Sequence, residues 1–597
     1  MGKKKRDGTL NIVEYTPSKY QEAIFDFIEN GIGNLVVEAV AGSAKTWTMV
    51  KGLEFIPRSK KVLFSAFNKD IVKELDKKIN GMENVDIRTL HSLGLTMLRR
   101  NFPEKKFVPE PFKYDAYIKQ NLRSISGANL YALDQKDYLR YSSNIKKYVE
   151  FGRFYLCQTA KDLDMIEERY GIDTIADEKE VAIEVMEWGK TELDTVDYTD
   201  MVWLPNTLYC KPIGLLYDFI MIDECQDMNK AERELVLKCF RMGTRMMCVG
   251  DRSQCVYSYA GSDPDSFSEL LKLPNTTKLP LSISYRCSKN IVEFAKKLVP
   301  GIEANNDGRE GVILENVSLN DIKDGDMIIC RNNAPLLKVY NDFLKLGKRA
   351  YIRGKELGSN MKLAVKSTKQ EFLNADCTKD GVFARLYYDL FVTRNKIANN
   401  SGIDVKMAME SPIVENKLDT IKALEILAEG INTSEELIAK IDEIFPKRSK
   451  KDGISLSTIH KSKGLEADNV YIACKSLMPS KAARKDWEVR QEHNLMYVAY
   501  TRARNVLGFI DEEDFKSFDN TSTKAVDRLE RIEKLVEKVL GKKTSLVVTS
   551  QTASEIIRNA TVIRQPIPKT RTIAIGSGNK INSFSDITRK RRSKIKR

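Results

Sequence analysis

A run of small residues that ends in a lysine and a threonine stands at residues 38–48, EAVAGSAKTWT, directly after the apolar run NLVV. Such a loop can wrap its backbone N–H groups around phosphates, while its lysine neutralises the terminal phosphates and its threonine reaches a magnesium ion. Lys45 and Thr46 fit these two roles. Ala44 stands where a glycine is usual, so a plain strand-to-helix turn is the alternative interpretation.

The alanine in this loop is expected to be tolerated. In a right-handed helical conformation its methyl group can point away from the phosphates, so activity should survive. The residues predicted to contact a nucleotide here are Ala41, Gly42, Ser43, Ala44, Lys45 and Thr46.

Two adjacent acids follow an apolar run further along the chain, in YDFIMIDECQD at residues 217–227. A nucleotide hydrolase needs one carboxylate to hold magnesium and another to orient the attacking water. Asp223 and Glu224, at the end of a predicted strand, supply both, and a solvated acidic turn is the alternative. Because the pair occurs together with AGSAKT, we favour the nucleotide site.

Composition bounds the class of protein. The chain has 597 residues, and at roughly 150 residues per domain this length suggests about four domains. No apolar stretch approaches the roughly 18 residues of a membrane span, and the N-terminal MGKKKRDGTL lacks the apolar segment of a secretory signal. We therefore expect a cytoplasmic protein without membrane contact. Ten cysteines occur singly, outside zinc-binding spacings, which indicates reduced, mostly buried thiols.

Basic residues are in excess, with a formal net charge of +14. They gather at both ends of the chain, as KKKR at residues 3–6 and RKRRSKIKR at residues 589–597. Solubility alone is one explanation, but this placement favours attraction to a polyanion. Tails of this kind neutralise phosphates without reading a base sequence.

Short apolar runs predict strands in two sets. The first set is residues 35–37, 62–67, 219–223 and 246–250, and the second is residues 327–331, 454–458, 470–474 and 506–510. Continuous apolar strands suit parallel sheets that helices cover on both faces. We therefore predict two α/β domains, each interrupted by a helical insertion, followed by an amphipathic stretch and a tail that is expected to be disordered.

Five stretches occur in a fixed order: DECQD at 223–227, GDRSQCVYSYAGS at 250–262, YRCS at 285–288, TIHKSKGLEADNVYI at 458–472 and NLMYVAYTRARN at 494–505. They resemble the ordered motifs of the UvrD/Rep family of superfamily 1 DNA helicases, over residues 15–510. Because an ordered series is more specific than one motif, the opening loop is interpreted as a phosphate-binding loop. The segment DYTDMVWLP at 197–205 is similar to one in the F-box DNA helicase branch.

The resemblance implies an α/β architecture of two RecA-like parallel-sheet P-loop domains, each with a mainly helical insertion. The predicted domains are a first RecA-like ATPase domain (1A) at 1–105 and 206–275, a helical insertion (1B) at 106–205, a second RecA-like domain (2A) at 276–354 and 453–515, a helical insertion (2B) at 355–452, and an amphipathic helix with a basic tail at 516–597.

The resemblance also assigns roles around ATP and Mg²⁺, which are the expected cofactors. Lys45 should neutralise the β and γ phosphates, Thr46 and Asp223 should hold the magnesium, and Glu224 should act as general base on water. Gln254, in DRSQC, should sense the γ-phosphate and relay its loss toward DNA.

Residues of the second α/β domain complete the implied nucleotide site. Arg286 in YRCS and Arg502 in YTRAR resemble two arginine fingers, which stabilise charge on the transferring phosphoryl group. Since the phosphate loop belongs to the first domain, hydrolysis should require the cleft between the domains to close. The expected nucleoside contacts are Gln21, Tyr285 and Glu466.

DNA contacts follow from the need to grip any base sequence. Aromatic platforms stack bases without reading them, at about 1–3 kcal/mol per base. Tyr257 and Tyr259, in VYSYAG, occupy family positions for such platforms. The other DNA contacts implied by the resemblance are Phe67, His91, His460 and Lys461.

The leading hypothesis is an ATP-dependent DNA helicase that moves 3′ to 5′ on single strands and couples hydrolysis to strand separation in replication, repair or recombination. Its expected partners are single-stranded DNA and duplex junctions, and the motor could work as a monomer. Two alternatives stay open: a single-strand translocase with little unwinding, and a non-catalytic DNA-binding subunit with a dead nucleotide site. Retention of the general base and both arginine fingers disfavours the second alternative.

Overall fold

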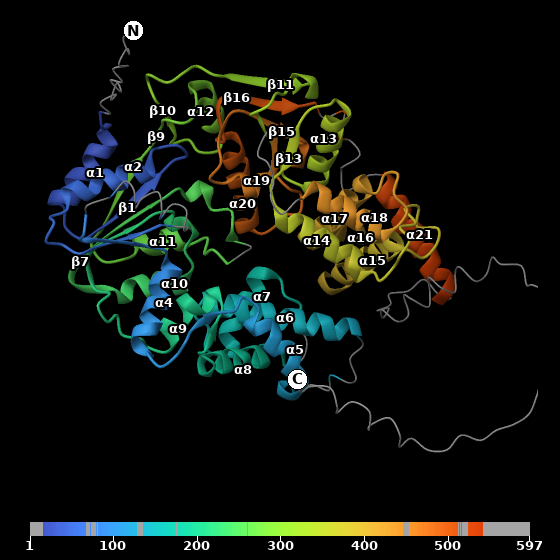
Figure 1. Ribbon diagram of the computed structural model, residues 1–597, viewed down its shortest axis with the longest axis horizontal. Coiled ribbons are helices and arrows are strands. Elements are labelled where there is room, and N and C mark those ends of the chain that lie inside the picture. Colours follow the sequence, from blue (N-terminus) through green and yellow to red (C-terminus); the bar gives the residue numbers. More distant parts are fainter. Residues whose placement is uncertain are drawn as a thin grey trace, which may run out of the picture.

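The computed structural model describes residues 16–66, 72, 79, 82–127, 130, 135–174, 177–258, 261–445, 453–511, 513, 515 and 523–540. These residues form two six-stranded parallel sheets, each flanked by helices, and two helical insertions (Figure 1). The prediction of two parallel-sheet α/β domains with mainly helical insertions is confirmed.

The first sheet has the strand order β3-β2-β6-β7-β1-β8. Its strands are β1 (Asn34–Ala39), β2 (Val62–Ser65), β3 (Val85–Arg88), β6 (Tyr217–Ile222), β7 (Phe240–Gly250) and β8 (Thr276–Leu281). Alternate side chains enter different cores: Val62 and Phe64 pack with α1 (Lys19–Asn30) and α2 (Lys45–Gly52), whereas Leu63 packs with the core on the opposite face. Burial on both faces explains why β2 is apolar throughout.

Strand β8 belongs to the first sheet, although its residues were predicted to lie in the second domain. Thr276–Leu281 pair with Asn34–Ala39 in parallel, so the first sheet continues to residue 281, although the second domain was predicted to begin at residue 276. The strand lies at the edge of the sheet and contains Pro280, which an edge strand tolerates. The strand was not predicted, because its sequence, TTKLPL, contains polar residues and a proline and therefore no continuous apolar run.

The second sheet has the order β11-β16-β15-β12-β14-β13. Its strands are β11 (Val312–Val317), β12 (Met327–Cys330), β13 (Ala350–Ile352), β14 (Ile454–Thr458), β15 (Ala467–Ala473) and β16 (Ala503–Ile510). The helices around it include α12 (Lys289–Ala295), α13 (Asn333–Lys345), α19 (Ile459–Ser462) and α20 (Asp486–Tyr500). A short pair, β9 (Ile283–Ser284) and β10 (Glu303–Ala304), follows the first sheet in the chain.

The first insertion packs on the helices of the first domain. It contains α5 (Lys113–Ile125), α6 (Gln135–Phe154), α7 (Asp164–Tyr170), α8 (Glu178–Thr191), α9 (Tyr198–Thr207) and the short strands β4 (Val108–Pro109) and β5 (Thr195–Val196). Helix α9 contacts α4 (Leu90–Asn101) and α10 (Lys230–Lys238), and α11 (Ser266–Leu271) precedes β8. In Figure 1 this insertion lies below the first sheet.

The second insertion is helical and includes a segment from beyond the second sheet. Its helices are α14 (Lys355–Ser367), α15 (Val382–Ser401), α16 (Val405–Met409), α17 (Pro412–Leu427) and α18 (Ser434–Ile444). The predicted amphipathic stretch forms α21 (Thr523–Leu540), which packs against α15 (Figure 1). Leu529 and Ile532 of α21 are buried in the core of this insertion, so its apolar face is covered.

All ten cysteines are free and buried, as predicted. Within the part of the chain that the structure describes, none of the helices combines the length and the apolar character needed to cross a membrane.

Candidate active site

The predicted phosphate-binding loop connects β1 to α2, which begins at Lys45. Ala44, the last residue of the loop, has φ 62° and ψ 36°, a left-handed conformation. This corrects the expected right-handed conformation, and it costs about 1–2 kcal/mol for a residue with a Cβ atom. The turn is held because the Ala44 carbonyl accepts hydrogen bonds from the backbone N–H of Thr48 at 2.9 Å and from its hydroxyl at 3.0 Å.

The loop has features that fit a bound phosphate. Gly42 has φ 72°, and a Cβ atom there would lie 2.4 Å from Cβ of Arg286, so this close approach requires glycine. The hydroxyl oxygen of Ser43 is buried and has no hydrogen-bond partner among the residues that the structure describes. A buried polar atom without a partner costs about 1–3 kcal/mol. A phosphate oxygen in the loop would supply the missing partner.

Lys45 lies among the acids at the ends of β6 and β7. Its Nζ is 2.8 Å from Oε1 of Glu224, and the neighbouring Thr46 donates its hydroxyl to Oδ2 of Asp223 at 3.1 Å. Burial alone would lower the pKa of Lys45, but the charges of Glu224, Asp223 and Asp251 raise this pKa to about 12. Lys45 is therefore a permanent cation at the mouth of the loop.

The two adjacent acids have opposite pKa shifts. Burial and the charge of Glu224 raise the pKa of Asp223. Burial would also raise the pKa of Glu224, but the ammonium groups of Lys45 and Lys463 lower it. Glu224 is therefore ionised, as a general base must be. Asp223 and Thr46 offer one carboxylate and one hydroxyl, and Mg²⁺ typically takes few protein ligands besides water and substrate phosphates.

Gln226 positions the carboxylate of Glu224. Its amide nitrogen donates to Oε2 of Glu224 at 2.6 Å, and its amide oxygen accepts the backbone N–H of Asp251 at 3.0 Å. One side chain thus fixes the end of β6 relative to the end of β7. Gln226 stands within DECQD but was not predicted as a site residue.

Lys463, a residue of the second domain, contacts the turn that follows β6. Its Nζ is 2.5 Å from Oδ2 of Asp227 and 2.7 Å from the carbonyl oxygen of Gln254. Lys463, Asp227 and Asp251 were not predicted as site residues, although each stands in one of the motifs quoted above. The only sequence feature that could have identified them is that they are polar residues inside motifs whose other residues were given roles.

Arg502 is a buried cation, with 1% of the residue exposed. Its Nε donates to the carbonyl of Val498 at 2.9 Å and its Nη1 to the carbonyl of Leu465 at 3.1 Å. Among the described residues, no carboxylate lies within ion-pair distance of it. Burial and repulsion by Arg286 lower its pKa to about 10. Because an unpaired buried charge is costly, this position is preorganised to receive an anion.

Gln254 connects the two domains through its side chain. Its amide nitrogen donates to Oδ2 of Asp251 at 2.6 Å, and its amide oxygen is 3.4 Å from Nη2 of Arg502. The hydroxyl of Tyr497, on α20, accepts the backbone N–H of Ala41 at 2.9 Å. The phosphate loop and the end of α20 are therefore in direct contact across the cleft.

Arg286 lies over the phosphate loop but is paired with an acid. Its Nε forms an ion pair with Glu466, which also accepts a hydrogen bond from Arg504 at 2.5 Å. Burial would raise the pKa of Glu466, but these two arginines lower it. The backbone N–H of Tyr285 donates to the carbonyl of Gly42 at 2.9 Å. In this structure Glu466, a predicted nucleoside contact, is therefore ion-paired with Arg286, a predicted arginine finger.

Gln21 is fully buried in the first turn of α1. Its amide nitrogen donates to the hydroxyl of Thr48 at 3.0 Å, and its amide oxygen accepts the backbone N–H of Ser18 at 2.9 Å. Both ends of the amide are therefore bonded to the protein. Contact with adenine would require Gln21 to exchange these bonds.

Comparison with known proteins agrees with this geometry. Residues 21–274 match the UvrD/REP helicase N-terminal domain, and residues 388–513 match the UvrD-like helicase C-terminal domain. The chain belongs to the UvrD/Rep helicase family. The candidate nucleotide site of this UvrD/Rep chain draws on both matched ranges, with Lys45 and Gln254 from the first and Arg502 from the second.

Relatives of this UvrD/Rep chain are distant in sequence. F-box DNA helicase protein 1 of Schizosaccharomyces pombe is 22% identical over 525 residues, which cover 79% of this chain and 55% of that protein. A probable DNA helicase II homolog of Mycoplasma pneumoniae is 23% identical over 302 residues, 46% of this chain and 41% of that protein. ATP-dependent DNA helicase PcrA of Staphylococcus aureus is 22% identical over 605 residues, 80% of each chain. The chain thus spans about half the length of the first two relatives.

One of the two tyrosines predicted to stack DNA bases, Tyr257, contacts residues of the second domain in this structure. Tyr257 is half-buried, donates its hydroxyl to the carbonyl of His460 at 3.1 Å, and has Nζ of Lys463 at 4.9 Å from its ring centre. Burial and the charge of Arg331 lower the pKa of His460 to about 3, so its imidazole is neutral. Tyr259 and Phe67 lie outside the described residues.

Two other predicted DNA contacts are partly exposed. Nδ1 of His91, on α4, is 4.0 Å from Oε1 of Glu232, and its ring centre is 6.3 Å from that of the exposed Tyr198. Nζ of Lys461 is 3.3 Å from Oε2 of Glu356 on α14. Both side chains are accessible to a ligand.

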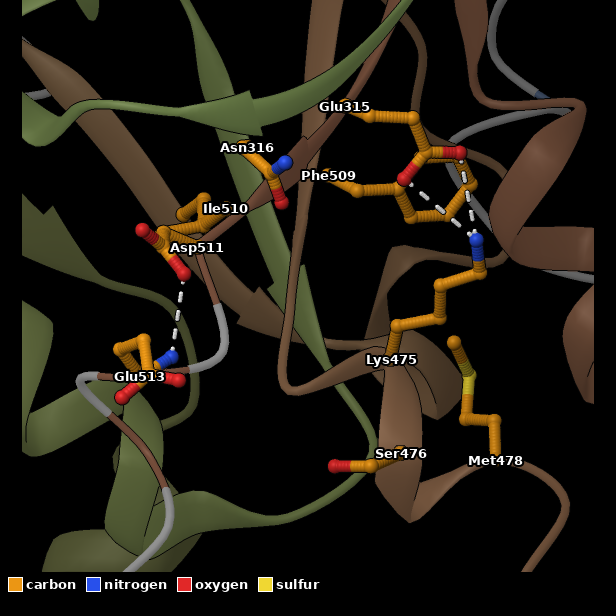
Figure 2. A pocket seen from close by; sticks show the side chains of 9 residues that line it. All are labelled: Glu315, Asn316, Lys475, Ser476, Met478, Phe509, Ile510, Asp511 and Glu513. Carbon is orange, nitrogen blue, oxygen red and sulfur yellow. Dashed lines mark hydrogen bonds and ion pairs between the residues drawn. The ribbon is translucent and has the colours of Figure 1, made fainter.

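A hollow of about 600 Å³ lies at the carboxyl ends of β11 and β16 (Figure 2). Nζ of Lys475 there is 3.2 Å from Oε1 of Glu315 and 4.1 Å from the ring centre of Phe509. The backbone N–H of Glu513 donates to Asp511 at 3.1 Å on its other side. None of the predicted site residues lines this hollow, so it is separate from the nucleotide cleft.

Proposed function

We propose that this UvrD/Rep chain is an ATP-dependent DNA helicase, which by family resemblance moves 3′ to 5′ on single-stranded DNA. The observation that carries the proposal is the buried guanidinium of Arg502, which has no carboxylate partner among the residues the structure describes. Through Gln254 it reaches the acids beside the phosphate loop. An anion between the domains would meet Lys45 from one side and Arg502 from the other.

The residues of the chain supply the proposed chemistry on ATP. Lys45 would leave its ion pair with Glu224 and bind the phosphates of ATP. The carboxylate of Glu224 would then be free to accept a proton from the attacking water. Thr46 and Asp223 would hold Mg²⁺, which would neutralise phosphate charge when bound. Arg502 would stabilise the charge that develops on the transferred phosphoryl group.

Hydrolysis would be coupled to DNA through the turn that follows β7. Gln254 contacts Arg502, and three residues further on Tyr257 donates to the carbonyl of His460. Loss of the γ-phosphate would release Arg502 from its ligand and let the cleft open. The same movement would shift Tyr257, the proposed base-stacking platform, relative to the second domain.

One observation favours a second candidate, a non-catalytic DNA-binding subunit. The left-handed Ala44 strains the phosphate loop at a position where glycine is free of strain. Against this candidate, Glu224 is ionised beside Lys45, and the buried Arg502 has no carboxylate partner among the described residues; hydrolysis would use both features. A translocase with little unwinding would have the same nucleotide site.

The proposed setting is the cytoplasm, in DNA replication, repair or recombination. Ten free, buried cysteines fit a reducing compartment, and a net charge of +14 fits a polyanionic partner. The proposed partners are single-stranded DNA and duplex junctions. Because the phosphate loop and both arginine fingers come from one chain, a monomer would suffice as the motor.

The test is ATP hydrolysis with and without a single-stranded oligonucleotide, followed by strand displacement on duplexes with a 3′ or a 5′ tail. The proposal expects DNA to raise turnover and only the 3′-tailed duplex to be unwound. Movement on single strands without displacement would identify a translocase. Absence of hydrolysis in every condition would identify the non-catalytic subunit, and unwinding from 5′ tails would contradict the direction.

A further inference from the structure

Helix α20 belongs to the second domain but makes contacts with the first domain at two levels. Near its C-terminal end the hydroxyl of Tyr497 accepts the backbone N–H of Ala41, in the phosphate loop, at 2.9 Å. About one turn earlier, Nδ2 of Asn494 donates to the carbonyl of Cys255 at 2.9 Å. This face of α20 therefore lies against the nucleotide cleft along its C-terminal half.

The N-terminal end of α20 reaches the first insertion instead (Figure 1). Lys485, which precedes the helix, donates its ammonium group to the carbonyls of Glu168 and Arg169, the latter at 3.0 Å. These carbonyls belong to the last turn of α7, where a helix leaves acceptors unpaired and its dipole favours a cation. The ring of Trp487 lies 6.2 Å from that of Tyr170 in the same turn.

The same turn of α7 also contacts the loop that precedes α11 in the first domain. The hydroxyl of Tyr170 donates to the carbonyl of Ser258 at 3.2 Å, and Nη2 of Arg169 is 3.3 Å from Oδ2 of Asp265. The Tyr170 ring is stacked on Phe151 of α6, with centres 3.9 Å apart and planes 5° apart. The turn is thus fixed to its own insertion and held between the two ATPase domains.

We propose that α20 is a rigid rod that transmits closure of the nucleotide cleft to the first insertion through Lys485. The helix has 15 residues, a length of about 22 Å at 1.5 Å per residue. Its Glu492 is paired with Arg331 at 2.8 Å, which fixes the middle of the rod to the second sheet. When the second domain approaches the phosphate loop, Tyr497 and Lys485 must therefore move together.

The consequence concerns the order of events on DNA. Docking of Lys485 on α7 would hold the first insertion against the loop that carries the proposed stacking residues only while the cleft is closed. Opening of the cleft would withdraw Lys485 and free the insertion to move. This inference rests on the proposed function, because it requires a nucleotide to close the cleft.

Amide hydrogen exchange of the full chain tests the rod, with and without a non-hydrolysable ATP analogue and Mg²⁺. In the parent protein the analogue should slow exchange several-fold both in α2 and in the last turn of α7. Lys485→Met keeps the aliphatic stem and loses the ammonium group, so protection of α2 should remain while protection of α7 is lost. Lys485→Arg should restore it, since a guanidinium can donate to the same carbonyls.

Arg490→Met is the matched control, because Arg490 is exposed on the same helix and its loss removes the same charge. It should behave as the parent does. If Lys485→Met kept the analogue-dependent protection of α7, the rod would be overturned. Faster exchange of α7 by the same factor with and without the analogue would assign Lys485 a merely structural role. If the analogue protected neither α2 nor α7 in the parent, the proposed nucleotide site itself would fail.

Discussion

The guanidinium of Arg502 lies 3.4 Å from the side-chain oxygen of Gln254, whose amide nitrogen donates to Asp251 at 2.6 Å. One amide therefore connects a buried cation of the second domain to a buried acid of the first. The acid and the cation do not touch directly, so the arginine keeps its charge available. Its hydrogen-bond acceptors among the described residues are neutral: the amide oxygen of Gln254, the hydroxyl of Thr501 and two backbone carbonyls. An arriving phosphate would therefore compete with neutral acceptors rather than with an ion pair.

Replacing Arg502 by methionine should lower DNA-stimulated ATP turnover by about 10³-fold or more, the contribution typical of an arginine finger. The melting temperature should change little or rise, because no carboxylate among the described residues is left without its partner. ATPase kinetics and calorimetry on the same samples check both statements. A large fall in melting temperature would instead show that Arg502 mainly holds the fold.

Replacing Ala44 by glycine should raise the free energy of unfolding by about 0.5–1 kcal/mol, because relief of the left-handed strain exceeds the entropic cost of glycine. Ala116, exposed within α5, is the control, and its change to glycine should lower the free energy of unfolding by about 1 kcal/mol. Thermal melts compare the two. ATPase should change modestly; activity in the glycine variant alone would mean that the natural chain is non-catalytic.

The stability of the protein should depend on pH through Asp251. Burial raises the pKa of Asp251 to about 6, against the opposing charge of Lys45. An acid with a raised pKa favours folding below its unfolded pKa of about 4, and this contribution is lost as the pH rises through the folded value. Asp251→Asn should therefore gain stability over the parent between about pH 4 and pH 6 and keep this gain above that range.

Melting temperatures across that pH range check the prediction for Asp251. The exposed Asp26→Asn serves as the matched control for the loss of one carboxyl group. If the difference in melting temperature between Asp251→Asn and the parent did not change with pH, burial would not penalise the Asp251 carboxylate.

Tyr257 should separate stacking on DNA from charge. Tyr257→Ala removes a ring but no charge, so affinity for single strands should fall while its slope against log salt stays nearly constant. Deletion of residues 589–597 should do the reverse, flattening the slope by about 0.7 for each DNA phosphate that the tail neutralises. Fluorescence anisotropy across a salt series measures both. Normal DNA binding by Tyr257→Ala would leave this ring with a packing role beside Lys463.

Tyr257→Phe gives a finer separation, because it keeps the ring and loses only the hydrogen bond to His460. We expect it to bind single strands as the parent does and to show weaker stimulation of ATPase by DNA. Unchanged stimulation would remove this hydrogen bond from the coupling route.

The sequence was informative wherever a strand is buried on both faces. β2 and β12 are buried at every position, and such strands require the continuous apolar runs that were recognised. β3, β8 and β11 were missed because most of their residues are half-buried or exposed, so polar side chains interrupt the pattern. β13 was missed because its three residues are too few to show a pattern. Side-chain exposure and strand length therefore both limited the prediction of the sheets.

Some contacts of the candidate site were predicted from the sequence, and others were not. The loop and acid motifs, together with the family resemblance, predicted Lys45 and Thr46 near the two acids, and the structure finds them at hydrogen-bond distance. The pairing of Arg286 with Glu466 depends on side chains from distant segments, and the sequence contains no signal for it. The left-handed Ala44 depends on turn geometry that residue type does not reveal. The catalytic roles themselves stay predictions.

The central claim is that Glu224 activates water in a DNA-stimulated ATPase, and steady-state hydrolysis by the parent and Glu224→Gln proteins, with and without single-stranded DNA, tests it most directly. DNA should stimulate ATP hydrolysis by the parent. Glu224→Gln should bind ATP at least as tightly as the parent, because Lys45 does not have to break an ion pair with residue 224 to reach the phosphates. Its turnover should fall by about 10²–10⁴-fold. Lys45→Ala should instead weaken ATP binding as well. Parental turnover by Glu224→Gln, or a parent that DNA does not stimulate, would contradict the account.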